Sequence, residues 1–154
     1  MTDTDRLLAR QAAEDLARHY VLTIDQRDFD AYRALFGDTV TIHYQPPLPG
    51  VDNGALDTKE WVKGATETFN AIPATQHIVV PASVTLSDDG ASATVTSNCQ
   101  AAHFDPEAKG GDTAFTQFIR YTHHVEKRGS GWIIAKVEAD ILYSTGNPMI
   151  LAGG

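Results

Sequence analysis

Two histidines and one aspartate are the residues of this 154-residue chain whose positions could support acid/base chemistry. His103 shares the parity of Cys99 on the apolar face of the segment 91–104, so its side chain is predicted to point inward. His77 lies just inside a β-branched stretch and shares a face with Val79. Imidazoles can exchange protons with a bound molecule near neutral pH. A buried histidine with only a structural hydrogen bond explains His103 equally well.

Asp25 is predicted to end a helix and to be the partner of a histidine. The inner face of that helix carries Leu16 and Tyr20, and a carboxylate pointing the same way is costly to bury unless it is paired. A carboxylate on one imidazole nitrogen fixes the tautomer and raises the basicity of the other nitrogen. Asp25 and His77 would then form a general base. The alternative is that Asp25 ends the helix in solvent, within the polar turn 25–28.

The other chemistry-bearing residues carry less information. Tyr44 ends a predicted strand and could donate its phenol to a bound oxygen, although an ordinary strand aromatic explains it as well. His123 and His124 are neighbours on a strand and point to opposite faces, so they cannot chelate one metal ion. We expect no metal and no other cofactor. Nucleophilic hydrolysis is also not expected, because Cys99 lies inside a strand and no Gly-x-Ser-x-Gly turn is present.

These residues need elements that bring them together, and the sequence pattern predicts three helices and five strands. The predicted helices span residues 5–25, 28–36 and 58–72, and the predicted strands span residues 39–44, 75–86, 91–104, 113–127 and 131–143. Helices that precede a run of long hairpin strands indicate an α+β fold. We expect a cone-shaped, curved, mixed but mostly antiparallel sheet with the three helices of the N-terminal half on its concave side, an α+β barrel. A single domain is expected over residues 1–154.

Caps and periodicity fix the predicted helix ends. The apolar stripe of the first helix is expected to include Leu8 and Tyr20. Asp28 and Thr58 are the expected N-caps of the second and third helices, and Gly37 is the expected C-cap of the second. The Pro/Gly-rich segment 46–57 is predicted to be a long loop of the kind that covers a pocket.

The charge balance excludes several classes of partner. With 12 Lys+Arg against 20 Asp+Glu the net charge is −8, whereas nucleic acids and anionic membrane surfaces require a basic patch. No apolar run is long enough to span a membrane. The single cysteine excludes an internal disulfide framework and fits a cytoplasmic location. Neither a nucleic acid nor a membrane is therefore expected as a partner. A small-molecule substrate is expected instead, because the mouth of a cone-shaped sheet is a natural ligand pocket.

Several short segments together resemble the SnoaL-like branch of the nuclear transport factor 2-like superfamily, and within it the scytalone dehydratase type. They are Ile-Asp-Gln-Arg-Asp-Phe-Asp at 24–30, Ile-His-Tyr at 42–44, Thr-Gln-His at 75–77, His103, Gly-Trp-Ile-Ile at 131–134 and Asp140. The similarity covers about residues 20–143. Each segment is short and degenerate, and their order and spacing carry the resemblance.

The resemblance implies an α+β cone with a deep pocket and no metal. In such dehydratases an Asp-paired histidine removes a proton next to a ketone, with a second histidine nearby and tyrosines on the carbonyl oxygen. On this chain the resemblance implies His77 as the acid/base and Asp25 as its orienting partner. It implies His103 as the second histidine and Tyr44 as the carbonyl-binding phenol.

The chain departs from the dehydratase pattern at two places. The position directly before the helix-end aspartate, a tyrosine in that pattern, is Ile24 here. The strand-borne asparagine has no match among residues 120–122. Tyr20, one helical turn before Ile24, could supply the missing phenol from a similar face.

The expected function is a cofactor-free dehydratase (lyase) or isomerase of a small, mostly apolar carbonyl compound of polyketide, aromatic or steroid-like type. The expected substrate-binding residues are Tyr20, Ile24, Trp61, Phe69, Val79, Phe115, Phe118 and Tyr121. One alternative is a polyketide-type cyclase that closes a ring by intramolecular aldol chemistry in the same pocket. Another is a non-catalytic small-molecule-binding or accessory module. The outer face of the sheet, expected to carry Phe104, Ile134 and Leu142, indicates a homodimer or homotrimer.

Overall fold

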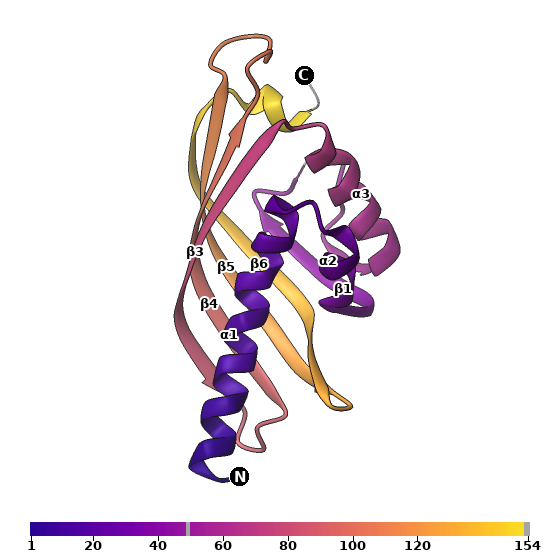
Figure 1. Ribbon diagram of the computed structural model, residues 1–154, viewed down its shortest axis with the longest axis vertical. Helices are drawn as coiled ribbons and strands as arrows, with labels where there is room; N and C mark the ends of the chain where they lie inside the picture. Colours follow the sequence, from indigo (N-terminus) through magenta and orange to yellow (C-terminus); the bar gives the residue numbers. More distant parts are fainter. Residues whose placement is uncertain (49, 153–154) are drawn as a thin grey trace.

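Three helices lie on one face of a curved six-stranded sheet in the computed structural model, which describes residues 1–48 and 50–152 (Figure 1). Pro49, inside the predicted loop 46–57, lies outside the described residues. The elements are α1 (Asp3–Asp25), α2 (Phe29–Ala34), β1 (Phe36–Gln45), β2 (Gly54–Asp57), α3 (Thr58–Asn70), β3 (Ala74–Leu86), β4 (Ser92–Phe104), β5 (Ala114–Arg128), β6 (Gly131–Gly146) and the short 3₁₀ helix η1 (Pro148–Ala152). The predicted α+β fold is confirmed.

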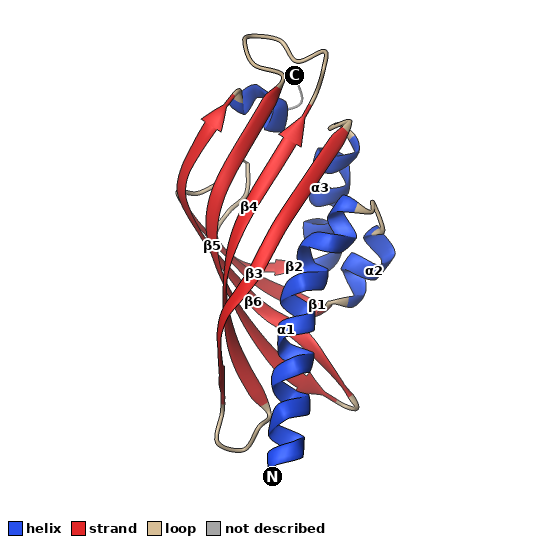
Figure 2. Ribbon diagram, turned by 60° about the vertical axis from the view of Figure 1, so that its left-hand side comes forward, coloured by secondary structure: helices blue, strands red, loops and turns tan. Residues whose placement is uncertain are grey.

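The sheet has the strand order β2-β1-β6-β5-β4-β3 and does not close into a barrel. All neighbouring strands are antiparallel except β1 and β6, which are parallel. The long strands β3 to β6 twist and curve around the helices, which cover only the concave face (Figure 2). β3 is therefore an edge strand, and α1 packs along its inner side.

Helix α1 begins with a capping box and buries mostly alanines. The Thr2 hydroxyl accepts a hydrogen bond from the backbone N–H of Asp5, and the Asp5 carboxylate accepts one from the backbone N–H of Thr2. The buried stripe consists of Ala9, Ala13, Ala17, Tyr20, Val21, Thr23 and Ile24. Leu8, predicted to be part of the stripe, is instead exposed. Because alanines are small, the helix lies close to the sheet, and its last two turns direct Tyr20 and Ile24 into the interior.

Two of the three predicted caps were wrong. Leu35, not Gly37, is the C-cap of α2, because the carbonyl of Leu35 accepts a hydrogen bond from the N–H of Ile134 and the chain passes directly into β1. Asp28 is the N-cap of α2 as predicted. Asp57, not Thr58, is the N-cap of α3, with its carboxylate accepting from the Lys59 N–H at 2.7 Å.

The chain after β6 folds back over the upper end of the sheet. Ile150 of η1 is buried against Ile72 and Phe115, so this segment closes the end of the cone opposite the N-terminus (Figure 1). Ile134, expected on the outer face, is fully buried in the main core. Among the described residues, no helix has both the length and the apolarity that a membrane crossing requires.

Candidate active site

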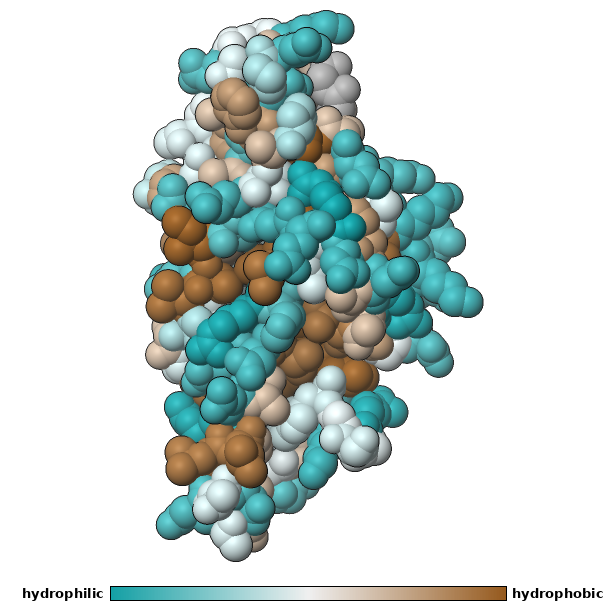
Figure 3. Space-filling model, in the orientation of Figure 1, coloured by the Kyte–Doolittle hydropathy of each residue, from teal (hydrophilic) through white to brown (hydrophobic). Residues whose placement is uncertain are grey.

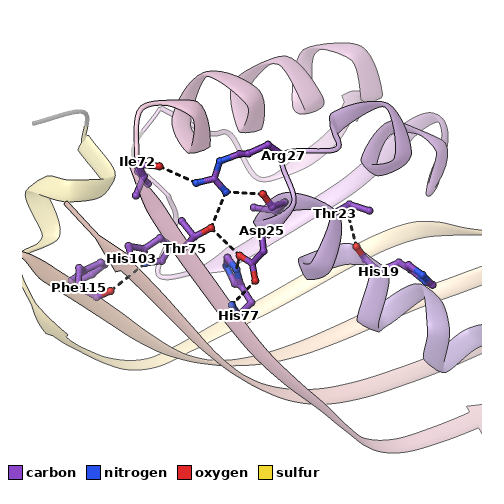
Figure 4. Close-up of polar contacts among 10 residues, drawn as sticks. His19, Thr23, Asp25, Arg27, Ile72, Thr75, His77, His103 and Phe115 are labelled. Carbon is purple, nitrogen blue, oxygen red and sulfur yellow. Dashed lines mark hydrogen bonds and ion pairs between the residues drawn. The ribbon is translucent and has the colours of Figure 1, made fainter. Parts of the chain in front are cut away.

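Asp25 and His77 are in direct contact where α1 ends beside the edge strand β3 (Figure 4). His77 Nδ1 donates to Asp25 Oδ1 at 2.6 Å, and the backbone N–H of His77 donates to Asp25 Oδ2 at 2.7 Å. These two bonds fix both the carboxylate and the ring. Since a carboxylate can only accept, Nδ1 carries the proton, and the lone pair of Nε2 is left as an acceptor.

The carboxylate of Asp25 receives a further hydrogen bond from Thr75. The Thr75 hydroxyl donates to Oδ1 at 2.9 Å, so three donors from β3 converge on one carboxylate. Burial acts to raise the pKa of Asp25, but the hydrogen bonds from His77 and Thr75 outweigh it and lower that pKa below its ordinary value. Asp25 is thus an anion at neutral pH.

His103 lies beside His77 with its ring nearly perpendicular. The two ring centroids are 5.7 Å apart, and Phe69 from α3 packs on both rings at 6.1 Å. His103 Nδ1 lies 3.3 Å from the carbonyl oxygen of Phe115, which can only accept, so Nδ1 carries the proton here too. Burial lowers the pKa of His103 to about 4, with a contribution from nearby His77. His103 is therefore neutral at pH 7 with Nε2 as an acceptor.

Tyr44 belongs to a neighbouring group of buried phenols. Its hydroxyl lies 3.4 Å from the hydroxyl of Tyr20, and the Tyr20 ring lies 5.6 Å from that of Tyr121. Burial raises the pKa of Tyr44 above its ordinary value, so it remains a hydrogen-bond donor. Burial, together with the charge of Asp25, raises the pKa of the Cys99 thiol to about 12.

Most of the predicted lining residues lie on the concave face. Ile24 and Phe115 are buried, Val79 packs against the core, and Trp61 Nε1 donates to Tyr32 at 3.1 Å. Phe118 does not join them, because strand alternation turns it to the outer face, where it stacks on Tyr143 at 4.3 Å.

Buried tyrosines line the interior of the cone. Tyr20, Tyr44 and Tyr121, each at most 8% exposed, belong to the main core. Two shallow surface hollows of about 410 and 380 Å³ lie elsewhere, at the two ends of the sheet, and are not lined by Asp25 or His77. The side chain of His77 is 4% exposed, so bulk solvent hardly reaches its ring.

The loop between β1 and β2 packs on the core beside Tyr44. Leu48 and Val51 pack on the main core, and the Asn53 side chain both accepts from the Tyr44 N–H and donates to the Tyr44 carbonyl, at 2.9 and 3.1 Å. These bonds hold the loop against β1 next to the phenols.

Sequence reasoning missed two members of the site, Thr75 and Arg27. Thr75 could have been found from its parity with His77 on β3. Arg27 lies within the segment 24–30 that carries the resemblance, but nothing in the sequence pattern gives it a role. Among the residues that the structure describes, no group of three His, Cys, Asp or Glu side chains could hold a metal ion.

Comparison with known proteins identifies the fold. A family model described as a SnoaL-like domain matches residues 5–138. The solved structure of the Kfla4162 protein from Kribbella flavida is 21% identical with a TM-score of 0.84, over 94% of this chain and 97% of that one. A scytalone dehydratase-like protein from Novosphingobium aromaticivorans is 18% identical with a TM-score of 0.79, over 95% and 92%. Hexachlorocyclohexane dehydrochlorinase LinA-type3 from Novosphingobium barchaimii is 17% identical with a TM-score of 0.74, over 96% and 95%. Among curated protein sequences, none matches the chain significantly.

Proposed function

The chain belongs to the family of SnoaL-like domains, and from that premise we propose that it is a cofactor-free dehydratase or isomerase of a small, mostly apolar carbonyl compound. The observation that carries the proposal is the 2.6 Å hydrogen bond from His77 Nδ1 to Asp25, which leaves Nε2 as a base. Similar structures named for a dehydratase and a dehydrochlorinase support an elimination reaction, because both names denote loss of a proton and a leaving group.

The reaction begins with removal of a proton α to the substrate carbonyl by His77 Nε2. The electrons of the broken C–H bond move to the carbonyl oxygen as an enolate, to which Tyr44 and Tyr20 donate hydrogen bonds. Asp25 stabilises the imidazolium that forms. The enolate then expels a β-hydroxyl, which takes the proton back from His77 Nε2 and leaves as water. An isomerase would instead return that proton to a different carbon.

His103 has a different role from His77 in this proposal. Because its Nδ1–H is donated to the Phe115 carbonyl and its ring is neutral, it has no proton to give at pH 7. Its Nε2 can only accept, and it would bind a substrate hydroxyl. The acid step therefore falls to His77 rather than to His103.

The test is turnover of a β-hydroxytetralone, which gives a naphthol on loss of water and can be followed by absorbance. Replacing His77 by Gln should lower the rate by roughly 10²–10⁴, the usual contribution of a general base. His43→Gln, an exposed histidine on β1, is the matched control and should leave the rate unchanged. Equal rates for wild type and His77→Gln would refute the assignment. A product with a new carbon–carbon bond would indicate the cyclase alternative.

We also propose a cytoplasmic homodimer or homotrimer. The single, buried cysteine fits a reducing compartment. Apolar side chains gather over β3 on the outer surface (Figure 3), where Ile78 and Val80 are 54% and 59% exposed. Contiguous apolar surface of this kind is typical of a subunit interface.

A further inference from the structure

Arg27 occupies an unusual backbone position next to the Asp25–His77 pair. It directly follows the C-cap of α1, and its φ of 58° lies in the left-handed region that residues with a side chain seldom adopt. The backbone N–H of Arg27 donates to the carbonyl of Ile24 at 3.0 Å, and that of Asp28 donates to the carbonyl of Thr23 at 2.9 Å. Arg27 thus takes the left-handed position of a Schellman helix end, which glycine usually occupies.

The guanidinium of Arg27 holds three elements together (Figure 4). Nη1 donates to the carbonyl of Ile24 at the end of α1, at 2.7 Å, and to the Thr75 hydroxyl on β3, at 2.8 Å. Nη2 donates to the carbonyl of Ile72, which follows α3, at 2.9 Å. One side chain thereby fixes the end of α1, which carries Asp25, relative to the strand that carries His77.

These contacts also give the hydrogen bond from Thr75 a single direction. A guanidinium can only donate, so the Thr75 oxygen accepts from Arg27. Its own hydrogen then points to Asp25 Oδ1, 2.9 Å away. The positive charge of Arg27 polarises this hydroxyl and strengthens the bond that it donates to the carboxylate.

We propose that Arg27 and Thr75 are positioning residues that keep Asp25 ionised and turned toward His77. The inference rests on the proposed base role of His77. Neither residue is placed against the reacting atoms: Thr75 acts on Asp25, and Arg27 acts through Thr75. Loss of either should weaken the base without removing it.

Thr75→Val tests the action of Thr75 on Asp25, because valine keeps the shape of threonine and removes its hydroxyl. The loss of a hydrogen bond to a charged group should lower kcat for β-hydroxytetralone about 10-fold with little change in KM. Thr75→Ser, which keeps the hydroxyl, should restore kcat. The substitution Thr85→Val, on the same strand but distant from the site, is the matched control and should have no effect.

A ¹³C NMR titration of the Asp25 carboxyl tests the hydrogen bond from Thr75 to Asp25 without any substrate. Removal of the Thr75 donor takes away one of the interactions that lower the pKa of Asp25, so the titration midpoint should move up in Thr75→Val. A folded Thr75→Val variant with an unchanged midpoint would overturn the inference. If wild type turns over no ketone, the proposed function fails, whereas the Asp25 titration still decides the positioning roles.

Arg27→Met tests the action of Arg27 through Thr75, and Arg10→Met is its matched control. Arg10 also joins α1 to β3, with one bond to the Val84 carbonyl at 2.9 Å, far from Asp25. If Arg27 positions Asp25, only Arg27→Met should lower kcat, by about 10-fold or more. Only this variant should also raise the midpoint of the Asp25 titration. Equal effects of both substitutions would mean that Arg27 only joins elements. Should Arg27→Met fail to fold, Arg27→Lys, which can hold Thr75 but not all three acceptors, provides the same comparison.

Discussion

At the residue scale, the charge of Asp25 links the proposed chemistry to stability. The pKa of Asp25 is lower in the folded protein than its ordinary 3.8, so the unfolded chain takes up the proton first as the pH falls. The stabilising contribution of this carboxylate is therefore complete above pH 3.8 and is lost below that pH. Asp25→Asn should be less stable than wild type at pH 7, and the gap should shrink below pH 3.8. Urea unfolding over a pH series measures both. A gap that stays constant with pH would show that the carboxylate is not held by its partners.

His123 is a second residue with a pH-dependent role, this time against stability. It is completely buried, and burial lowers its pKa to about 3. Among the residues that the structure describes, neither ring nitrogen has a hydrogen-bond partner. Because the unfolded histidine is protonated below pH 6.5 while the folded one is not, the protein loses stability as the pH falls from 6.5 toward 3.

His123→Phe removes this cost and keeps a ring among Tyr20 and Tyr121. It should stabilise the protein by about 1 kcal/mol or more at pH 7, since an unpaired buried polar group is lost. At pH 5 the further gain should be about 2 kcal/mol. That pH lies about 1.5 units below the pKa of 6.5 of the unfolded histidine, and each unit is worth about 1.36 kcal/mol. Thermal unfolding at both pH values is the measurement, with exposed His43→Phe as control. A gain that does not grow at low pH would contradict the account.

The sequence predicted single side-chain directions well and pairings less well. The inward direction of His103 followed from strand alternation, because a period of two is a property of the backbone. The contact between Asp25 and His77 was expected as one of two alternatives, since spacing alone cannot decide whether a helix-end carboxylate meets a strand. The role of Arg27 could not be predicted, because it depends on a left-handed backbone angle and on three acceptors from distant segments.

At the scale of elements, the end of β6 depends on one glycine. Gly146 has a φ of +88°, and a Cβ atom there would overlap the carbonyl oxygen of Ala114, the same oxygen that accepts from the Asn147 N–H. Gly146→Ala should destabilise the protein by at least about 3 kcal/mol, from backbone strain and overpacking together. Gly110→Ala is the control: φ is +84° but the space is open, so only the strain, about 1 kcal/mol, is expected. Chemical denaturation compares them, and equal losses would mean that the overlap relaxes freely.

The sequence predicts the bounds of some elements well and misses others. The four long strands lie within about three residues of their predicted ranges, because alternation and turn residues are local signals. Strand β2 was not predicted: four residues next to a proline-rich loop become a strand only because β1 offers an edge to pair with. Phe118 was assigned to the pocket by residue type, although its parity placed it on the outer face.

At the scale of the whole molecule, helices cover the concave face of the sheet, whereas no helix of the described residues covers its outer face (Figure 2). The interior carries buried tyrosines and the Asp25–His77 pair. The outer face of the curved sheet carries exposed apolar side chains, among them Ile78 and Val80, and such surface is typical of an interaction site. A second copy is the proposed cover, and register supports it. Ile78, Gln100, Phe118 and Tyr143 are aligned across four strands as one row.

The next row of this face carries one positive and one negative side chain. Arg120 and Asp140 are aligned across β5 and β6 beside the apolar row, and both are exposed. In a two-fold dimer, one patch meets the same patch of its partner in reversed direction, so the arginine of one copy can oppose the aspartate of the other.

Val80→Lys places a charge on this face without touching the interior and therefore tests the assembly. Wild type should behave as a dimer or trimer in analytical ultracentrifugation, and Val80→Lys should shift the population to monomer, because an unpaired lysine is costly to bury in an interface. Leu8→Lys is the matched control: Leu8 is 63% exposed on α1, away from the sheet, and its change should leave the association state unaltered. Circular dichroism of both variants checks that the fold is retained. A monomeric wild type at the highest attainable concentration, or a Val80→Lys protein that still associates, would show that this face is not the interface.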